Sequence, residues 1–128
     1  KKYSSGATWE DIVGYSRAVQ VGNYIEIAGT TSLVNGEIVG LGDVYQQTKI
    51  ILQKIEKIIN EAGGKLSDVI RTRIFVVDIG QWEKVAKAHG EFFKDIKPAS
   101  TMVEVSALIH PDMLVEIEAT AIIDENDV

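Results

Sequence analysis

The sequence predicts an α+β domain in which two helices cover one face of a mixed β-sheet. Three observations predict it: two segments with helical apolar spacing, five segments rich in β-branched residues, and a length of 128 residues. That length suits a single domain over residues 1–128. The element order is β-β-α-β-α-β-β, and placing both helices on one face of one sheet buries their apolar sides most simply.

Five segments are expected to be strands because they are short and rich in Val, Ile, Thr and Tyr. They are residues 17–21, 24–30, 70–78, 101–105 and 115–123. The first two form a hairpin, since Gly22-Asn23 is a two-residue turn signal between them. Ser67-Asp68 predicts a short helical turn before the third strand.

Two segments are expected to be helices. Apolar residues recur every three or four positions over residues 44–62 and again over residues 82–93. Asp43 suits the N-cap of the first helix, and Gly63-Gly64 suits its end.

Alternation along the strands predicts two different faces of the sheet. The face assigned to the helices carries Ile70, Ile74, Val76, Val103, Val105, Val115, Ile117 and Ala119. The opposite face carries Tyr24, Glu26, Arg71, Arg73, Phe75, Met102, Glu104, Glu116 and Glu118. Because this second set mixes acids, bases and large apolar groups, it favours a subunit interface. A solvated face of an antiparallel sheet is the alternative.

The charge, apolar content and counts of Cys and His in the chain argue against several classes of function. The formal charge is −6 and there is no basic cluster, which disfavours nucleic-acid partners. No apolar run reaches the ~20 residues of a membrane span, and the N-terminal residues do not read as a signal peptide, so we expect a cytoplasmic protein without a membrane partner. With no cysteine and two isolated histidines, we expect no metal site and no cofactor.

Short motifs along nearly the whole chain match a known family in order. They are Gly14-Tyr15, Gly22-Asn23, Ala28-Gly29, Glu61-Ala62-Gly63, residues 69–76 with Asp78, Phe92-Phe93, Pro98-Ala99, Val103-Glu104-Val105 and residues 116–119. On these motifs the chain resembles the YjgF/RidA family, the enamine/imine deaminases and their relatives. The resemblance implies a chorismate-mutase-like fold. It also implies a homotrimer that binds small metabolites in clefts between neighbouring subunits.

The resemblance also implies functional residues. Glu118 matches the acid that activates water, and Tyr15 matches the aromatic residue of the cleft. In the deaminases, an arginine after Pro-Ala binds the carboxylate of a 2-imino acid, and a cysteine follows two residues later. This chain has Ser100 and Met102 at those positions, so efficient 2-iminobutanoate deamination is not expected.

Other residues could replace the missing cation. Arg17 and Arg73 are the candidates, and Thr101 is a further candidate for the cleft wall. The alternative is that Arg71 and Arg73 pair with Glu104, Glu116 or Glu118 of this or the next subunit, while Arg17 is solvated.

Two functions remain open on the sequence. The first is a deaminase or related hydrolase that acts on imine-type small substrates through Glu118. The second is a non-catalytic trimer that binds a metabolite or a protein partner. A third, ribonuclease activity or inhibition of translation, is an older label of the family, and the acidic composition counts against it. The ligand cannot be named from these residues.

Overall fold

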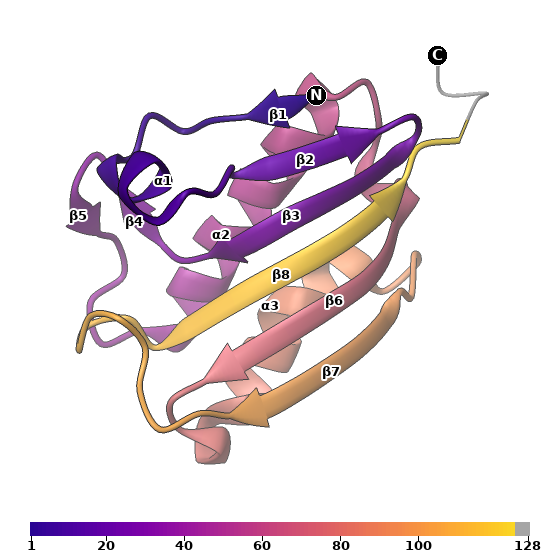
Figure 1. Ribbon diagram of the computed structural model, residues 1–128. Coiled ribbons are helices and arrows are strands. Elements are labelled where there is room, and N and C mark those ends of the chain that lie inside the picture. Colours follow the sequence, from indigo (N-terminus) through magenta and orange to yellow (C-terminus); the bar gives the residue numbers. More distant parts are fainter. Residues whose placement is uncertain (125–128) are drawn as a thin grey trace.

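The computed structural model describes residues 1–124 and contains a six-stranded mixed sheet (Figure 1). The strand order is β1 (Lys2–Tyr3), β2 (Ala18–Val21), β3 (Tyr24–Thr30), β8 (Val115–Ile122), β6 (Val69–Val76) and β7 (Ala99–Glu104). β7 runs parallel to β6, and every other pair in this sheet is antiparallel. The predicted mixed sheet is therefore confirmed. β7 is an edge strand, since it pairs with β6 alone.

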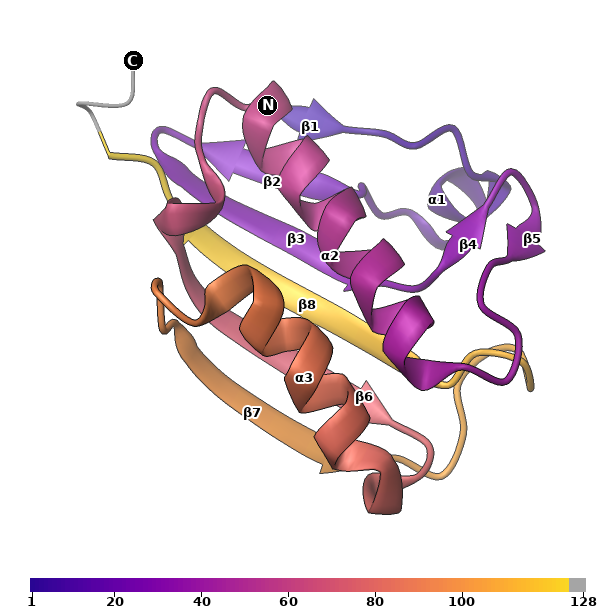
Figure 2. The same ribbon diagram turned by 180° about the vertical axis from the view of Figure 1, so that it is seen from behind.

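Both long helices lie on one face of this sheet, as predicted (Figure 2). They are α2 (Val44–Glu61) and α3 (Trp82–Phe93). The Asp43 side chain accepts a hydrogen bond from the backbone N of Gln46 at 3.0 Å and caps α2. A 3-10 turn, η1 (Leu66–Asp68), leads into β6 at the place where a short helical turn was expected.

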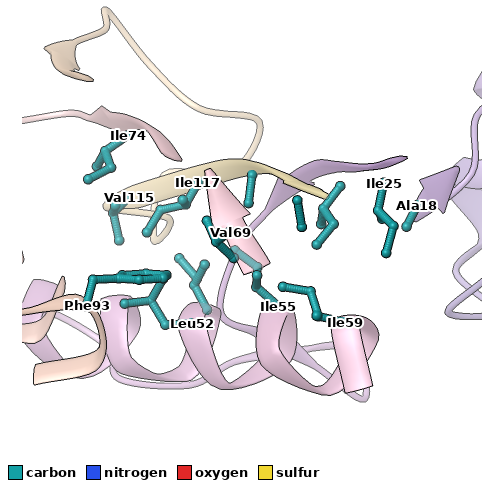
Figure 3. Packing of buried hydrophobic residues seen from close by; sticks show 14 of the residues in the cluster. Ala18, Ile25, Leu52, Ile55, Ile59, Val69, Ile74, Phe93, Val115 and Ile117 are labelled. Carbon is teal, nitrogen blue, oxygen red and sulfur yellow. The ribbon is translucent and has the colours of Figure 1, made fainter. Parts of the chain in front are cut away.

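The core fills the space between the helices and the sheet (Figure 3). Leu52, Ile55 and Ile59 point from α2 toward the sheet, and Phe93 does so from α3. Ile117 of β8 is fully buried among them. This packing fixes the sheet in place, so its other face, called here the outer face, is left without a helical cover.

Several short elements were not predicted. They are β1, the helix α1 (Thr8–Val13), the hairpin of β4 (Leu33–Val34) and β5 (Glu37–Ile38), and the 3-10 turn η2 (Ile79–Gln81). Each is too short to show a helical or strand-like repeat of apolar residues in the sequence. α1 also exposes most of its apolar side chains, because Trp9 is 52% and Ile12 is 71% exposed.

The predicted faces of β7 were wrong. Its register with β6 pairs Ile74 with Met102 and Phe75 with Val103. Met102 therefore packs against the core, whereas Val103 lies on the outer face and is 42% exposed. Both residues are apolar, so alternation alone could not decide the phase, and one residue of shift exchanges the two faces.

Two further face assignments need correction. Ile70 is 46% exposed, because an irregularity in the β6–β8 register between Val69 and Arg71 turns it away from the helices. Glu104 does not lie beside the other glutamates of the sheet. It accepts a hydrogen bond from the backbone N of Ile79 at 3.0 Å.

Candidate functional site

The outer face carries a hollow of about 770 Å³ next to α1. Its lining comes from the N-terminal segment, α1, the start of β2, β3, β6 and β8. The residues are Lys2, Glu10, Asp11, Gly14, Tyr15, Ser16, Val19, Glu26, Ile27, Ala28, Arg73 and Glu118. Three residues predicted from the sequence, Tyr15, Arg73 and Glu118, thus share one concave surface. The lining mixes acidic, basic and apolar groups, as binding sites for small polar molecules do.

Glu118 and Arg73 form a cross-strand ion pair within this hollow. They are register partners on β8 and β6, and 3.8 Å separates Arg73 Nη1 from Glu118 Oε1. Their side chains are 39% and 38% exposed, so both can also reach a ligand. This position gives a carboxylate that can accept a proton and a guanidinium that holds it in place.

Arg17 lies beside the hollow and is held on both sides. Its Nη2 donates a hydrogen bond to the carbonyl oxygen of Gly29 at 2.5 Å, and its guanidinium lies 5.7 Å from the centroid of the Tyr15 ring. Its Nε is buried and makes no hydrogen bond within residues 1–124. The expectation of a solvated Arg17 is therefore wrong. Arg17 connects Tyr15 to the backbone of β3.

Glu116 is a second carboxylate on the outer face of β8. It packs so closely on Gly29 that a Cβ added there would lie 2.0 Å from Glu116 Oε2. Burial raises the pKa of Glu116; the charge of Arg17 lowers it in part, and the nearby charge of Glu118 raises it further. Glu116 is thus protonated more readily than a free glutamate.

Sequence reasoning missed two charged residues around this site. Glu10 is 6% exposed and accepts hydrogen bonds from Ser5 N and Ser5 Oγ. Burial would raise the pKa of Glu10, but the hydrogen bonds from Ser5 and Ser4 outweigh it and lower that pKa. Lys54 donates to the carbonyl oxygen of Thr31 at 2.7 Å, and burial, with the charge of Arg17, lowers its pKa to about 8. Neither position belongs to a recognised motif: Glu10 is held by Ser5, five residues earlier, and Lys54 contacts a residue in a different segment of the chain.

The three candidates on β7 do not line the hollow of their own chain. Thr101 Oγ1 accepts a hydrogen bond from Arg71 Nη2 at 2.6 Å. Ser100 instead accepts one from Thr72 Oγ1 at 2.8 Å, and Met102 packs against the core. The structure therefore divides the predicted site residues into a group at the hollow and a group on the edge strand.

Residues 1–124 contain neither a membrane-spanning helix nor a cluster of metal ligands. No helix there has the length and apolar character needed to cross a bilayer. No three His, Cys, Asp or Glu side chains within that range are grouped so that they could hold a metal ion.

The chain matches a protein-family model described as endoribonuclease L-PSP, over residues 6–123. It belongs to this family. Among solved structures, a member of the YjgF/YER057c/UK114 family from Mycobacterium tuberculosis is 45% identical, with a TM-score of 0.87 over 96% of this chain and 98% of that one. The predicted YjgF/RidA membership and fold are thereby confirmed.

Two curated relatives are named after RutC, and one of them has a name that states an activity. A RutC family protein of Pyrococcus abyssi is 40% identical over 109 residues, which is 84% of each chain. The 3-aminoacrylate deaminase RutC of Acinetobacter baylyi is 33% identical over 108 residues, covering 84% of this chain and 85% of the relative. The relatives thus include a protein that is named for deamination.

Proposed function

We propose that this L-PSP family chain is a cytoplasmic homotrimer that hydrolyses imines or related small substrates, with Glu118 as the proton acceptor. The observation that carries the proposal is the partly exposed Glu118 carboxylate, which Arg73 holds at the hollow that Tyr15 also lines. The deaminase name of the Acinetobacter baylyi relative supports the same reaction type.

The residues at the hollow suit addition of water to a C=N bond. Glu118 takes a proton from water while the water oxygen bonds to the imine carbon. The imine binds in its protonated form, so this addition gives a neutral carbinolamine. The carbinolamine collapses to a carbonyl compound and an ammonium ion as its nitrogen takes up the hydroxyl proton and the proton held by Glu118. Glu118 returns its proton during this collapse, so it is unchanged at the end. Arg73 keeps the carboxylate oriented through the 3.8 Å ion pair.

The trimer is part of the proposal, and the composition of the outer face supports it. Apolar side chains there are exposed in the single chain: Val19 (37%), Val21 (72%), Tyr24 (42%), Val103 (42%) and Ile122 (39%). They alternate with charges of both signs, a pattern that suits a subunit interface. In such an assembly, the free edge of β7, with Ser100, borders the hollow of the neighbouring copy.

The test is an assay of imine hydrolysis. An amino-acid oxidase generates imines, and release of the keto acid is followed with and without this protein. We expect the protein to accelerate release and Glu118→Gln to abolish the acceleration, because an amide cannot accept the proton from water. The matched control is Glu61→Gln, which makes the same change at an exposed position at the end of α2.

A Glu118→Gln variant with undiminished acceleration would remove Glu118 from the mechanism. If the unaltered protein gives no acceleration but binds small acids saturably, the non-catalytic metabolite-binding function is correct instead. Ser100 favours this second function, because it stands where the resemblance implies an anchoring arginine.

A further inference from the structure

The three arginines of the chain, all within residues 1–124, differ in whether their donors are already used. Arg17 and Arg71 each donate from Nη2 to an oxygen of another strand, and neither lines the hollow. Arg73 lines the hollow and makes no hydrogen bond within residues 1–124. Its ion pair with Glu118 is 3.8 Å long, which exceeds hydrogen-bond distance. Because the Arg73 side chain is 38% exposed, its guanidinium can bind an anion that enters the hollow.

Two acids of the hollow are already bonded within the chain. Glu26 Oε1 accepts a hydrogen bond from Thr120 Oγ1 at 2.6 Å, and Glu26 Oε2 accepts one from Tyr24 OH at 2.7 Å. Glu10 accepts two hydrogen bonds from the N-terminal segment. These carboxylates therefore do not need a cationic ligand to satisfy them, whereas Arg73 still has donors to give.

Apolar surface of the hollow lies on strands away from Arg73. Val19 of β2 is 37% exposed and Ala28 of β3 is half-buried, and both line the hollow. β3 and β8 separate β2 from β6, so three inter-strand spacings place the backbones of β2 and β6 about 14 Å apart. The Arg73 side chain covers part of this distance, since it meets Glu118 on β8. The remaining space suits an acid whose side chain is larger than a methyl or ethyl group.

We propose that Arg73 binds the carboxylate of the substrate, and that a large apolar side chain of the substrate covers Val19 and Ala28. The substrate class is accordingly imines of 2-oxo acids with an aromatic or large apolar side chain. This inference rests on the proposed function, because it takes Glu118 as the proton acceptor. Arg73 supplies from β6 the cation that is absent at Ser100.

The geometry of the ion pair allows Arg73 to bind both carboxylates at once. Arg73 Nη1 faces Glu118, which leaves Nη2 and Nε for two parallel hydrogen bonds to the ligand carboxylate. The imine carbon is bonded directly to that carboxylate. It is therefore held near Glu118, where water can be activated.

The experiment compares three stable ligands: 3-phenylpropanoate, its amide and propanoate. Dissociation constants are measured by NMR titration of the full chain. We expect 3-phenylpropanoate to bind about fivefold more tightly than 3-phenylpropanamide, because only the acid gains charge-assisted hydrogen bonds from Arg73. We expect it to bind about tenfold more tightly than propanoate, because the phenyl ring covers apolar surface of the hollow.

Arg73→Gln tests the anchor, because it removes the charge and keeps a polar side chain. We expect the preference for the acid over the amide to disappear. Arg71→Gln is the matched control. It makes the same change two residues along β6, at an arginine that donates to Thr101 and does not line the hollow, so the preference should remain.

Glu118→Gln gives a readout that a purely structural role of Arg73 would not change. It removes the negative charge that shares Arg73 with the ligand. We therefore expect the acid to bind at least about twofold more tightly than it does to the unaltered protein, and the amide to bind equally well.

Five results would overturn the inference. They are an amide that binds as tightly as the acid, propanoate that binds as tightly as 3-phenylpropanoate, a preference for the acid that survives Arg73→Gln, unchanged binding of the acid to Glu118→Gln, and no binding at millimolar concentration. A failure of the proposed hydrolysis is a separate result. Glu118→Gln would then leave imine hydrolysis unchanged while the unaltered protein still prefers the acid.

Discussion

The two faces of the sheet differ in how far their side chains are buried, although the same strands supply both faces. On the helix-covered face, Ile74 and Ile117 are register partners that are at most 2% exposed. One residue along each strand, Arg73 and Glu118 are register partners on the outer face, with more than a third of each side chain exposed. The side chains on the helix-covered face thus form the core, whereas the adjacent residues on the outer face can contact a ligand.

This difference shows how the fold separates stability from function. α2 and α3 need only one face of the sheet to bury their apolar sides, so the outer face is not required for the core. The outer face can therefore hold carboxylates and guanidinium groups at fixed register positions. The rigid core below keeps their spacing constant, which a site built on loops would not do.

The largest expected effect comes from breaking the helix-covered face. Leu52→Ala removes a fully buried side chain and should lower the free energy of unfolding by about 2–5 kcal/mol. Phe75→Ala on the outer face should cost about 1 kcal/mol in the isolated chain, because Phe75 is only half-buried. Urea unfolding at low and high protein concentration measures both losses of unfolding free energy. An additional loss caused by a weakened subunit interface appears only at high concentration, where the chains associate. Equal losses of unfolding free energy for the two variants at low concentration would contradict the assignment of the core to the helix-covered face.

An intermediate effect is expected where the outer face is most crowded. Gly29→Ala puts a Cβ 2.0 Å from Glu116 Oε2, so the carboxylate must move away from Arg17. We expect a loss of up to about 1 kcal/mol in unfolding free energy, because the clashing atom is the end of a flexible side chain that can turn away. In a Glu116→Ala background the same substitution should cost less, because the clashing group is gone. A double-mutant cycle by thermal unfolding measures the difference, and additive losses would show that the two residues do not interact.

The smallest expected effect is on the pH dependence of stability, to which Glu116 on the outer face and His89 of α3 contribute in opposite directions. The raised pKa of Glu116 means that the folded state holds its proton more tightly, so this contribution to stability is lost as pH rises from about 4.5. The lowered pKa of His89 has the opposite result, and its contribution is lost as pH falls below about 6.5.

Each response is isolated by a variant that does not titrate. Relative to the unaltered protein, Glu116→Gln should gain stability as pH rises from about 4.5, and His89→Gln should gain it as pH falls below about 6.5. Chemical unfolding across pH 4 to 8 measures both gains. If the difference in unfolding free energy between a variant and the unaltered protein stays constant across this range, the substituted group has the same pKa in the folded and unfolded chain.

Much of the fold was predictable because its elements carry their own local signals. The predicted helix over residues 44–62 agrees with α2 because both its apolar period and its Asp43 cap are local features. The strand pattern of residues 115–123 likewise agrees with β8, whose alternate residues Val115, Ile117 and Ala119 are fully buried. The phase of β7 was not predictable, because it depends on which β6 residue each of its residues meets.

The candidate site was predictable only in part. Glu118 and Tyr15 were found by their match to a family, and the structure brings both to one hollow. The close approach of Gly29 to Glu116 and the contact of Lys54 with Thr31 could not be predicted, since each joins residues far apart in the chain.

By itself, the sequence determined the kinds of elements, their order and the family, because apolar spacing, caps and short motifs are properties of contiguous residues. Only the tertiary structure decided which side chains meet: Arg73 with Glu118, Arg17 with Gly29, and Ser100 with Thr72 and His89. The physical reason is strand register. A shift of one residue in pairing changes the face and the partners of every side chain, and register is set by the packing of the whole sheet against its helices.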